Sequence, residues 1–292
     1  MGQLGRYAHF AEKSEVAELG SRVEAPGNAA QPAGGGISLQ VKTDTGTETM
    51  PLEDYVLGVV AAEMPASFAE EALKAQAVAA RTYTVRKLLH GGCGRCPGGL
   101  CTDSAHCQAY AGEEQLRARW GEAYAANHAK VEAAVRETAG QVLTYDGAVI
   151  EALFHSSSEG STEDCAHVFA QDLPYLKAVS SPEAEQKSEV RLAAADFIAR
   201  ADAAFGDCGL KADALAGQVE VRARYESGRV QTLRLGSREV SGTAARRAFS
   251  LRSANFSVAV QGGEVVFAVR GYGHGVGMSQ RGADALAADG QG

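Results

Sequence analysis

The sequence lacks the features that mark nucleic-acid-binding and membrane-spanning proteins. Its formal net charge is −8, so it offers no basic stripe to neutralise phosphates, and we expect no nucleic-acid partner. No apolar segment reaches the length that spans a bilayer. The opening, MGQLGRYAHFAEKSEVAELG, shows no basic stretch followed by an apolar one, so no signal peptide is readable. Membrane contact is therefore expected only through a leader or anchor outside this sequence, and the final AADGQG suggests a further C-terminal segment.

Familiar nucleotide-binding and hydrolase motifs are also missing. The segment GYGHGVGMSQ (271–280) has neither the GxGxxG spacing with a downstream acid nor the Lys-Ser/Thr of a P-loop. The segment HSSS (155–158) places a histidine beside three serines, but no nucleophile elbow surrounds it. A phosphate site and a serine hydrolase are both disfavoured.

The expected fold is α+β. The chain does not alternate strand and helix over any length, which disfavours a doubly wound sheet and favours hairpins in a mixed sheet with a long Ala-rich helix. Strands or hairpins are expected in 37–60, 141–155, 219–236 and 257–270, and helices in 69–89, 113–138 and 183–206.

The sequence predicts one catalytic domain after an N-terminal extension. Residues 1–36 lack periodicity and end in AAQPAGGG, which is typical of a linker. Residues 37–292 form the expected domain, in which 183–255 is the least distinctive part and a candidate subdomain.

Glu63 is the leading candidate for catalysis. It follows the apolar run VLGVVAA and precedes a proline-marked turn and the long helix. Burial of a carboxyl group in such a setting raises its proton affinity, which a general acid near neutral pH requires. The alternative interpretation is a carboxylate that caps the N-terminus of the following helix. Both interpretations remain open.

Two later segments offer neutral polar groups that match the hydroxyl-rich surface of a glycan. Hydroxyl, amide and imidazole groups suit sugar hydroxyls, and glycines around His274 let the backbone approach a ligand closely. The alternative for the second segment is a tight glycine crossover with an exposed histidine. The candidate contacts are His155, Ser156, Ser157, His274, Ser279 and Gln280.

A cluster of cysteines and histidines lies in HGGCGRCPGGLCTDSAHC (90–107). Its density is typical of a structural zinc site with closed sulfur and nitrogen ligation. Two disulfides are the competing interpretation for an exported protein. The expected ligands are Cys101, His106, Cys107 and Cys96, with Cys93 and His90 as alternatives for the fourth position.

These segments, in this order, resemble the stage II sporulation protein D (SpoIID) / LytB family. The matching blocks are PLEDYVLGVVAAEMPASFAEEALKAQAVAARTYTV, CTDSAHCQAYAG, TAGQVLTYDGAVIEALFHSSSEGSTED, PYLKAV and GYGHGVGMSQRGADALAADG. The resemblance runs from about residue 38 to the end and its first and last blocks are long and specific.

The resemblance implies a peptidoglycan lytic transglycosylase in which Glu63 is the catalytic acid and base. It implies glycan strands already stripped of stem peptides as substrate, and hence a cell-wall amidase as partner. It also implies zinc at Cys101, His106 and Cys107. Family members are usually exported or membrane-anchored and act on the cell wall during sporulation, so an extracytoplasmic location is expected.

Further residues follow from that substrate. Lys74 and Arg81 share one helix face and are candidates to bind the lactyl carboxylate of a muramic sugar, with solvated helix charges as the alternative. Tyr83 is a candidate glycan contact. Glu159 departs from the family, which has glycine there, and either strains the loop or adds charge beside the glycan.

Two rival functions remain. A LytB-like chain would bind glycan without cleaving it and stimulate an amidase. A zinc hydrolase is disfavoured, because closed cysteine-rich sites rarely leave a coordination position for water.

Overall fold

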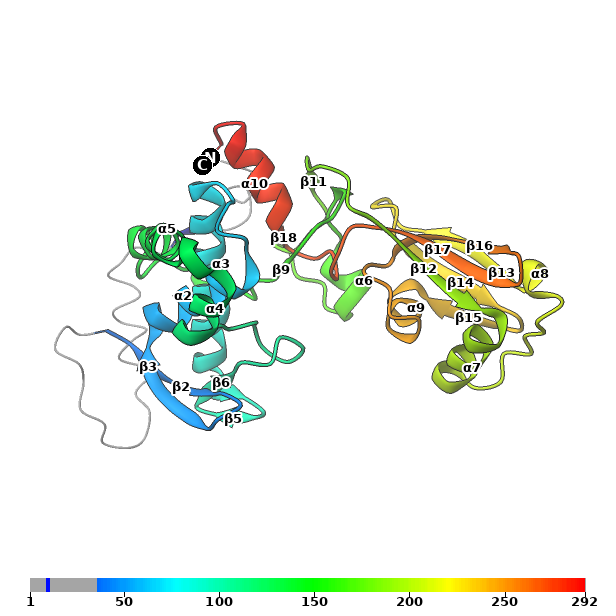
Figure 1. Cartoon of the computed structure of the whole chain (residues 1–292), viewed down its shortest axis with the longest axis horizontal. Coiled ribbons are helices and arrows are strands. Elements are labelled where there is room, and N and C mark those ends of the chain that lie inside the picture. The colour runs from blue at the N-terminus through cyan, green and yellow to red at the C-terminus, as the bar shows by residue number, and fades with distance from the viewer. Residues whose placement is uncertain (1–8, 11–35, 292) are drawn as a thin grey trace. The chain divides into compact units, whose positions relative to one another are not determined.

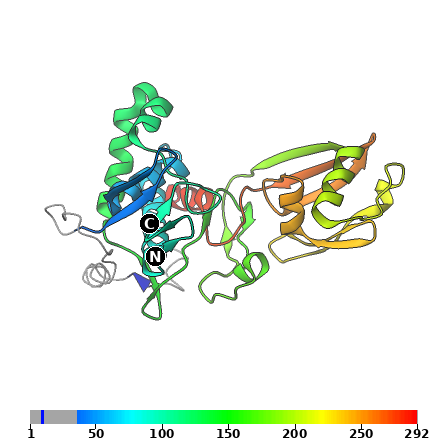
Figure 2. The ribbon, with the colours of Figure 1, turned by 90° about the horizontal axis from the view of Figure 1, so that it is seen from below.

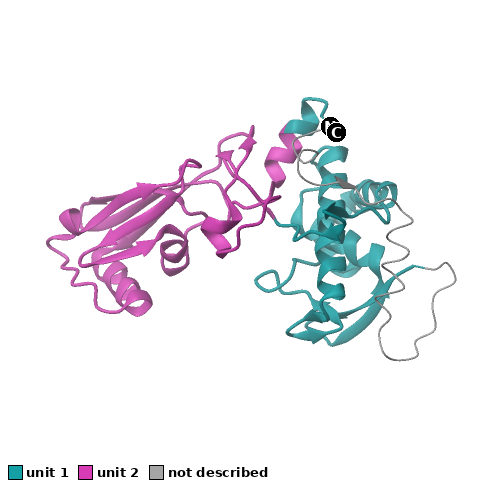
Figure 3. Cartoon of the chain, turned by 180° about the vertical axis from the view of Figure 1, so that it is seen from behind, with its two compact units in different colours: residues 1–153, 286–292 teal, residues 154–285 magenta. Residues whose placement is uncertain are grey.

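The computed structural model describes residues 9–10 and 36–291, which belong to two compact units (Figure 1, Figure 3). Unit 1 is Met1–Leu153 with Leu286–Gly292, and unit 2 is Phe154–Ala285. The expected extension, 1–36, lies outside the described residues apart from 9–10 and 36. The expected boundaries of the catalytic domain and its subdomain stay predictions.

Helices and several small sheets make up both units, so the α+β class expected from the sequence is confirmed. None of the described helices combines the length and the apolar character that crossing a bilayer requires.

Unit 1 combines a bundle of helices with a small mixed sheet. Strand β2 (Ser38–Lys42) pairs antiparallel with β3 (Thr47–Pro51) and parallel with β6 (Gly99–Cys101). The helices are α2 (Leu52–Glu63), α3 (Glu70–Leu89), α4 (Glu113–Trp120) and α5 (Tyr124–Glu137). Two small hairpins complete it: β4 (Gly92–Cys93) with β5 (Cys96–Pro97), and β7 (Leu143–Tyr145) with β8 (Ala148–Val149), where β1 (His9–Phe10) also pairs with β7.

The expectation of a strand through VLGVV is wrong, because this run forms the middle of helix α2. Its valines Val56, Val59 and Val60 are fully buried. A short, uniformly apolar run carries no periodicity that separates a buried strand from a buried helix. As a consequence, Glu63 is the last residue of α2 and not a residue between a strand and a helix.

The long helix is confirmed as α3, whereas the second expected helix is interrupted. Gly121, with φ of 51°, ends α4, and the 3-10 helix η2 (Gly121–Ala123) links it to α5. The turn of the expected hairpin after α5 is confirmed, with positive φ values of 49° at Asp146 and 75° at Gly147, but its second strand ends at Val149 and not at His155.

Unit 2 is built on two three-stranded antiparallel sheets. One has the order β12 (Lys187–Ala193), β17 (Glu264–Arg270), β16 (Asn255–Gln261), and the other has β13 (Val219–Arg224), β14 (Val230–Leu235), β15 (Arg238–Ser241). Helices α7 (Ala194–Phe205), α8 (Leu215–Gln218) and α9 (Gly242–Ala248) lie against these strands (Figure 2). Both expected hairpins, β13–β14 and β16–β17, are confirmed. The expected helix 183–206 is only half right, because β12 pairs with β17 along all its residues before α7 begins.

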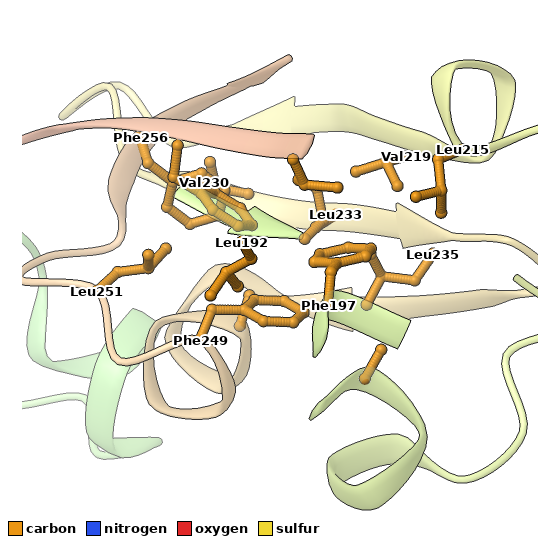
Figure 4. Close-up of a cluster of buried hydrophobic side chains, with 14 of the residues drawn as sticks. Leu192, Phe197, Leu215, Val219, Val230, Leu233, Leu235, Phe249, Leu251 and Phe256 are labelled. Atoms are coloured by element: carbon orange, nitrogen blue, oxygen red, sulfur yellow. The ribbon is translucent and has the colours of Figure 1, made fainter. Parts of the chain in front are cut away.

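One hydrophobic core joins the two sheets and the helices of unit 2 (Figure 4). Its centre is a stack of aromatic rings, in which Phe249 lies 4.8 Å from Phe197 and 5.2 Å from Phe267 between ring centroids. Such rings bury large apolar areas and hold the surrounding segments rigidly. The core therefore supports the connecting segments that carry the polar residues of unit 2.

Those segments contain short elements: β9 (Phe154–His155), β10 (Gly160–Ser161), α6 (Cys165–Phe169), β11 (Ser180–Ser181), β18 (Met278–Ser279) and the first residues of α10 (Gln280–Ala288), whose last three residues belong to unit 1. Strand β9 pairs parallel with β18, which sets His155 opposite Ser279. The serine segment and the C-terminal glycine segment are thus neighbours within unit 2.

Candidate active site

Glu63 ends helix α2 and is half-buried. Its Oε1 accepts a hydrogen bond of 2.9 Å from the main-chain N–H of Ala109. The carbonyl end of a helix is an unfavourable place for a negative charge. The capping alternative is wrong, because the N-cap residue of α3 is Ala69 and not Glu63.

The segment that contacts Glu63 is fixed to α2 on both sides of Ala109. The N–H of Ala111 donates to the carbonyl of Gly58 over 3.1 Å. The ring of Tyr110 stacks on Tyr55 with centroids 5.5 Å apart and lies over Gly58, where a Cβ would come within 2.3 Å of that ring. A glycine at position 58 therefore allows the close approach that brings the Ala109 amide to Glu63.

Four candidate metal ligands converge at the start of the same segment. The ligand atoms of Cys93, Cys101, His106 and Cys107 all lie within 4.8 Å of one another. The Nδ1 of His106 is 3.2 Å from the sulfur of Cys101 and 3.5 Å from that of Cys107. Three sulfur atoms and one imidazole make a donor set that fits a closed tetrahedral zinc site.

The structure corrects the fourth ligand. Cys96 was expected there, but its Sγ lies 4.0 Å from the carbonyl of Gln40 in β2, and Cys93 completes the group instead. His90, the other alternative, has its Nδ1 2.7 Å from the carbonyl of Arg86 at the end of α3. All six cysteines are free thiols in the structure.

Asp103 supports this group from the turn that precedes His106. Its carbonyl accepts hydrogen bonds from the N–H groups of His106 and Cys107, over 3.0 and 2.8 Å. Its carboxylate accepts from the N–H of Ala105 and pairs with Arg95, and these two contacts lower the pKa of Asp103. These contacts help to hold the turn in shape.

The structure overturns the proposed substrate role of Arg81. The residue is completely buried, and all five of its N–H groups donate within the protein, to Glu53 and to the carbonyls of Ala77, Val135 and Gln141. A guanidinium with every donor engaged has none left for a ligand. Arg81 therefore fixes α2, α3 and the segment after α5 to one another.

The other two candidates on α3 stay predictions. Lys74 pairs with Glu137 and Glu71, over 2.8 and 2.7 Å, and the hydrogen bonds that it donates to these carboxylates raise its pKa. Tyr83 is buried, and burial followed by the neighbouring Cys107 raises its pKa. Tyr83 thus adjoins the cysteine group.

In unit 2, His155 organises the serine segment from inside the protein. The ring is 4% exposed, with Nδ1 3.1 Å from the carbonyl of Val276 and Nε2 2.5 Å from the hydroxyl of Ser158. Burial, then the charges of His274 and Arg229, place its pKa well below the ordinary value, so the ring is neutral. Ser157 is also buried and its backbone pairs with Tyr272, whereas Ser156 is half-buried.

His274 lies at the outer side of this arrangement. Its ring centroid is 5.6 Å from that of His155, and its Nδ1 accepts a hydrogen bond from the N–H of Val276. Burial and the nearby Arg246 lower its pKa to about 4. The following Gly275 has φ of 87° and packs on Arg229, whose Nε would lie 2.4 Å from an added Cβ. Of the predicted glycan contacts in unit 2, His274 is therefore the histidine that reaches the surface.

Known proteins share much of this sequence. Residues 41–145 match the family described as SpoIID, Stage II sporulation protein. The chain is 40% identical to stage II sporulation protein D of Bacillus amyloliquefaciens over 245 residues, which are 84% of this chain and 70% of that protein. It is 37% identical to the protein of the same name in Bacillus subtilis strain 168, over 84% of this chain and 71% of that protein. The chain belongs to the stage II sporulation protein D family.

A shorter match links the chain to a second kind of protein. An amidase enhancer of Bacillus subtilis strain 168 is 38% identical over 121 residues, which are 41% of this chain and 14% of that protein.

Within this member of the family, the structure answers the question raised by Glu159. Its backbone has φ of 56°, the conformation that glycine adopts with least strain. Its side chain turns inward, is 6% exposed, accepts from the N–H of Gly271 over 3.1 Å and lies 3.8 Å from Arg270. The added carboxylate is therefore paired inside the protein and does not project toward a ligand.

Sequence reasoning missed Glu183, which holds the serine segment in place. Its Oε1 accepts from the N–H groups of Ser158 and Glu159, over 2.7 and 2.9 Å, and from the hydroxyl of Ser279 over 2.9 Å. Ser279 in turn caps α10 by accepting from the N–H of Gly282, and the adjacent Gln280 is buried at the helix start. Glu183 lies in the least distinctive part of the sequence, where no pattern marks it.

Proposed function

We propose that the chain is a peptidoglycan lytic transglycosylase in which Glu63 is the single acid and base. The observation that carries the proposal is the carboxyl of Glu63, held at the end of α2 by the Ala109 amide within the region that matches the family. Family membership supports a role in the cell wall during sporulation, and hence an extracytoplasmic location.

In the proposed reaction, Glu63 gives its proton to the oxygen between N-acetylmuramic acid and N-acetylglucosamine. The bond from that oxygen to the anomeric carbon breaks, and the carbon gains oxocarbenium character. The carboxylate then removes the proton of the sugar's own 6-hydroxyl, whose oxygen bonds to the anomeric carbon. The product is a 1,6-anhydro ring, so one carboxyl group replaces the two of ordinary glycosidases.

The cysteine group has a structural part in this proposal. Cys93, Cys101, His106 and Cys107 would hold zinc, which supplies a cross-link between the β4–β5 hairpin, β6 and the following turn. Cys107 stands two residues before Ala109, so this cross-link steadies the amide that contacts Glu63. Full ligation by protein atoms leaves no position for a water nucleophile, which disfavours a zinc hydrolase.

A second candidate function is a glycan-binding modifier of a cell-wall amidase. The similarity to an amidase enhancer favours it, and the proposed partner is an amidase that removes stem peptides. In this alternative the same groups contact sugar, but Glu63 transfers no proton.

Peptide-free glycan strands incubated with the purified protein separate the candidates, with mass analysis of the strand ends. Anhydro ends that disappear in Glu63→Gln support the transglycosylase. Reducing ends support a hydrolase instead. Intact strands with retained binding support the amidase modifier.

A further inference from the structure

Two large hydrophobic side chains stand exposed in the described residues, and both belong to the neighbourhood of His274 in unit 2. Phe169 is 44% exposed and Tyr272 is 50% exposed. The ring of Phe169 meets that of His274 edge-on with centroids 5.3 Å apart, and Tyr272 precedes His274 by two residues. Large apolar rings gathered at one place on a surface mark a binding site more often than isolated ones do.

The position of Tyr272 is set by the backbone and not by its own ring. Its N–H and carbonyl exchange hydrogen bonds of 2.8 and 2.9 Å with Ser157. The next residue, Gly273, donates its N–H to the carbonyl of Arg252 over 2.9 Å. The exposed ring is therefore presented on a fixed backbone, which lowers the entropy lost when a ligand binds.

Two arginines accompany the rings. The guanidinium of Arg252 lies 5.2 Å above the centre of the Tyr272 ring, and Arg246 lies near enough to His274 to lower its pKa. In residues 9–10 and 36–291, no carboxylate lies within ion-pair distance of either arginine, although acids outnumber bases by 36 to 28 in the chain. In a protein with an excess of acidic residues, two arginines without a carboxylate partner are unusual. Their positive charge favours the binding of an anion at this place.

We propose that Tyr272, Phe169 and Arg252 form a subsite for a sugar that carries a carboxylate, and that its occupant is an N-acetylmuramic acid residue with a free lactyl group. This inference rests on the proposed function for its substrate class. An aromatic ring packs on the apolar face of a pyranose, and a guanidinium stacked on that ring offers paired donors to a carboxylate. The ring of His274 packs edge-on against Phe169, and its polar atoms bond within the protein, to Val276 and Phe154, so it positions the aromatic side of the subsite.

The subsite gives a physical reason for a preference for peptide-free strands. A stem peptide joined to the lactyl group converts its carboxylate into an amide and removes the charge that Arg252 would bind. The peptide would also add bulk beside Phe169. Arg252 is therefore the proposed partner of the lactyl carboxylate. The sequence suggested that role for Arg81, whose donors are all engaged within the protein.

The test measures binding in full chains that carry Glu63→Gln, so that cleavage does not interfere. Three tetrasaccharide probes are titrated by calorimetry: a peptide-free muramyl tetrasaccharide, the same molecule bearing stem peptides, and a tetramer of N-acetylglucosamine. The variants are Arg252→Gln and Tyr272→Ser. The matched control is Arg200→Gln, which removes an exposed arginine from α7 in the same unit.

We expect Arg252→Gln to weaken binding of the peptide-free muramyl probe about five- to tenfold, as loss of a charge-assisted pair predicts, and to leave the N-acetylglucosamine tetramer unchanged. Tyr272→Ser should weaken both probes, and Arg200→Gln neither. Three results would overturn the subsite. The first is that Arg252→Gln weakens binding of both probes equally, and the second is that Arg200→Gln weakens binding of the muramyl probe as much as Arg252→Gln does. The third is that the parent protein binds the peptide-bearing probe as tightly as the peptide-free one. A parent protein that binds no saccharide would overturn it as well, and would assign the exposed rings to a protein partner.

Failure of this inference is distinguishable from failure of the proposed function. The strand-end assay with intact Glu63 reports cleavage whether or not Arg252 contributes. If the Arg252→Gln variant cleaves at the normal rate at every substrate concentration, the proposed function stands and the proposed subsite is wrong.

Discussion

The N–H of Ala109 donates to Oε1 of Glu63 over 2.9 Å, and Ala109 follows the candidate metal ligand Cys107 by two residues. The same segment is fixed to α2 by the hydrogen bond from Ala111 to Gly58. Orientation of the proposed acid therefore depends on two anchors, the cysteine group on one side and Gly58 on the other.

Gly58→Ala should damage the second anchor. Its Cβ would come within 2.3 Å of the Tyr110 ring and 2.9 Å of the Ala111 carbonyl, so the segment must shift. Overpacking of this kind destabilises a protein by about 1–3 kcal/mol. We expect a loss of stability in urea titration together with reduced formation of anhydro ends. Gly112→Ala is the control, because the nearest atom to its Cβ is 3.9 Å away, and equal effects of the two would refute the anchor.

Glu63→Gln should abolish turnover without unfolding the protein. Replacement of a positioned general acid typically lowers the rate by about 10²–10⁴-fold. Glu70→Gln, an exposed glutamate in the first turn of α3, is the matched control and should retain activity. The measurement is the initial rate of anhydro-end formation, with thermal unfolding as the check on folding. Normal turnover in Glu63→Gln would contradict the proposed mechanism.

Much of the scaffold could be predicted from local patterns. The hydrophobic spacing of α3, the Asp146-Gly147 turn and the β13–β14 and β16–β17 hairpins are each encoded within a few neighbouring residues. The run VLGVV could not be assigned, since burial on every side removes the periodicity that separates helix from strand.

The sequence indicated which residue types take part in the site, but not which residues contact one another there. Glu63 and the ligands Cys101, His106 and Cys107 stood out in the sequence, whereas the choice of Cys93 over Cys96 depends on where the β4–β5 hairpin packs against β2. No sequence pattern indicates the role of Glu183, because its carboxylate contacts Ser158, which lies 25 residues earlier in the chain. Contacts of this kind arise from tertiary structure, which no local pattern encodes.

The two hairpin cysteines should differ in metal binding. Cys93→Ser removes a member of the converging group and should lower the zinc content and the thermal stability of the protein. Cys96→Ser removes a buried thiol that lies toward Gln40 and should leave the zinc content unchanged. The measurement is zinc per chain by atomic emission after purification in the presence of zinc. Loss of zinc in Cys96→Ser with retention in Cys93→Ser would reverse the assignment.

Arg81→Met should destabilise unit 1 far more than Lys74→Met. Removal of the buried guanidinium leaves three carbonyls and the Glu53 carboxylate without their donors, and loss of one partner from a buried ion pair costs about 3–5 kcal/mol. The half-exposed position of Glu53 places the expected loss at the lower end. The ion pairs of Lys74 are on the surface and should contribute about 0–1 kcal/mol. Urea titration compares the two, and similar losses would contradict the internal role of Arg81.

Acidification should weaken the protein through His274. Its pKa is about 4 in the folded protein against an ordinary value of 6.5, so between these values the unfolded chain binds more protons. Stability is therefore complete above pH 6.5, falls as the pH drops toward 4 and is level below that. At 1.36 kcal/mol per pKa unit, this histidine contributes at most about 3 kcal/mol.

The buried His155 acts in the same direction, because burial also lowers its pKa. His274→Gln should therefore flatten the slope of unfolding free energy against pH between about 4 and 6.5 without abolishing it. Urea titrations at half-unit pH intervals measure that slope. An unchanged slope in His274→Gln would show that the imidazole is as easily protonated in the folded protein as in the unfolded chain, which would contradict the lowered pKa of His274.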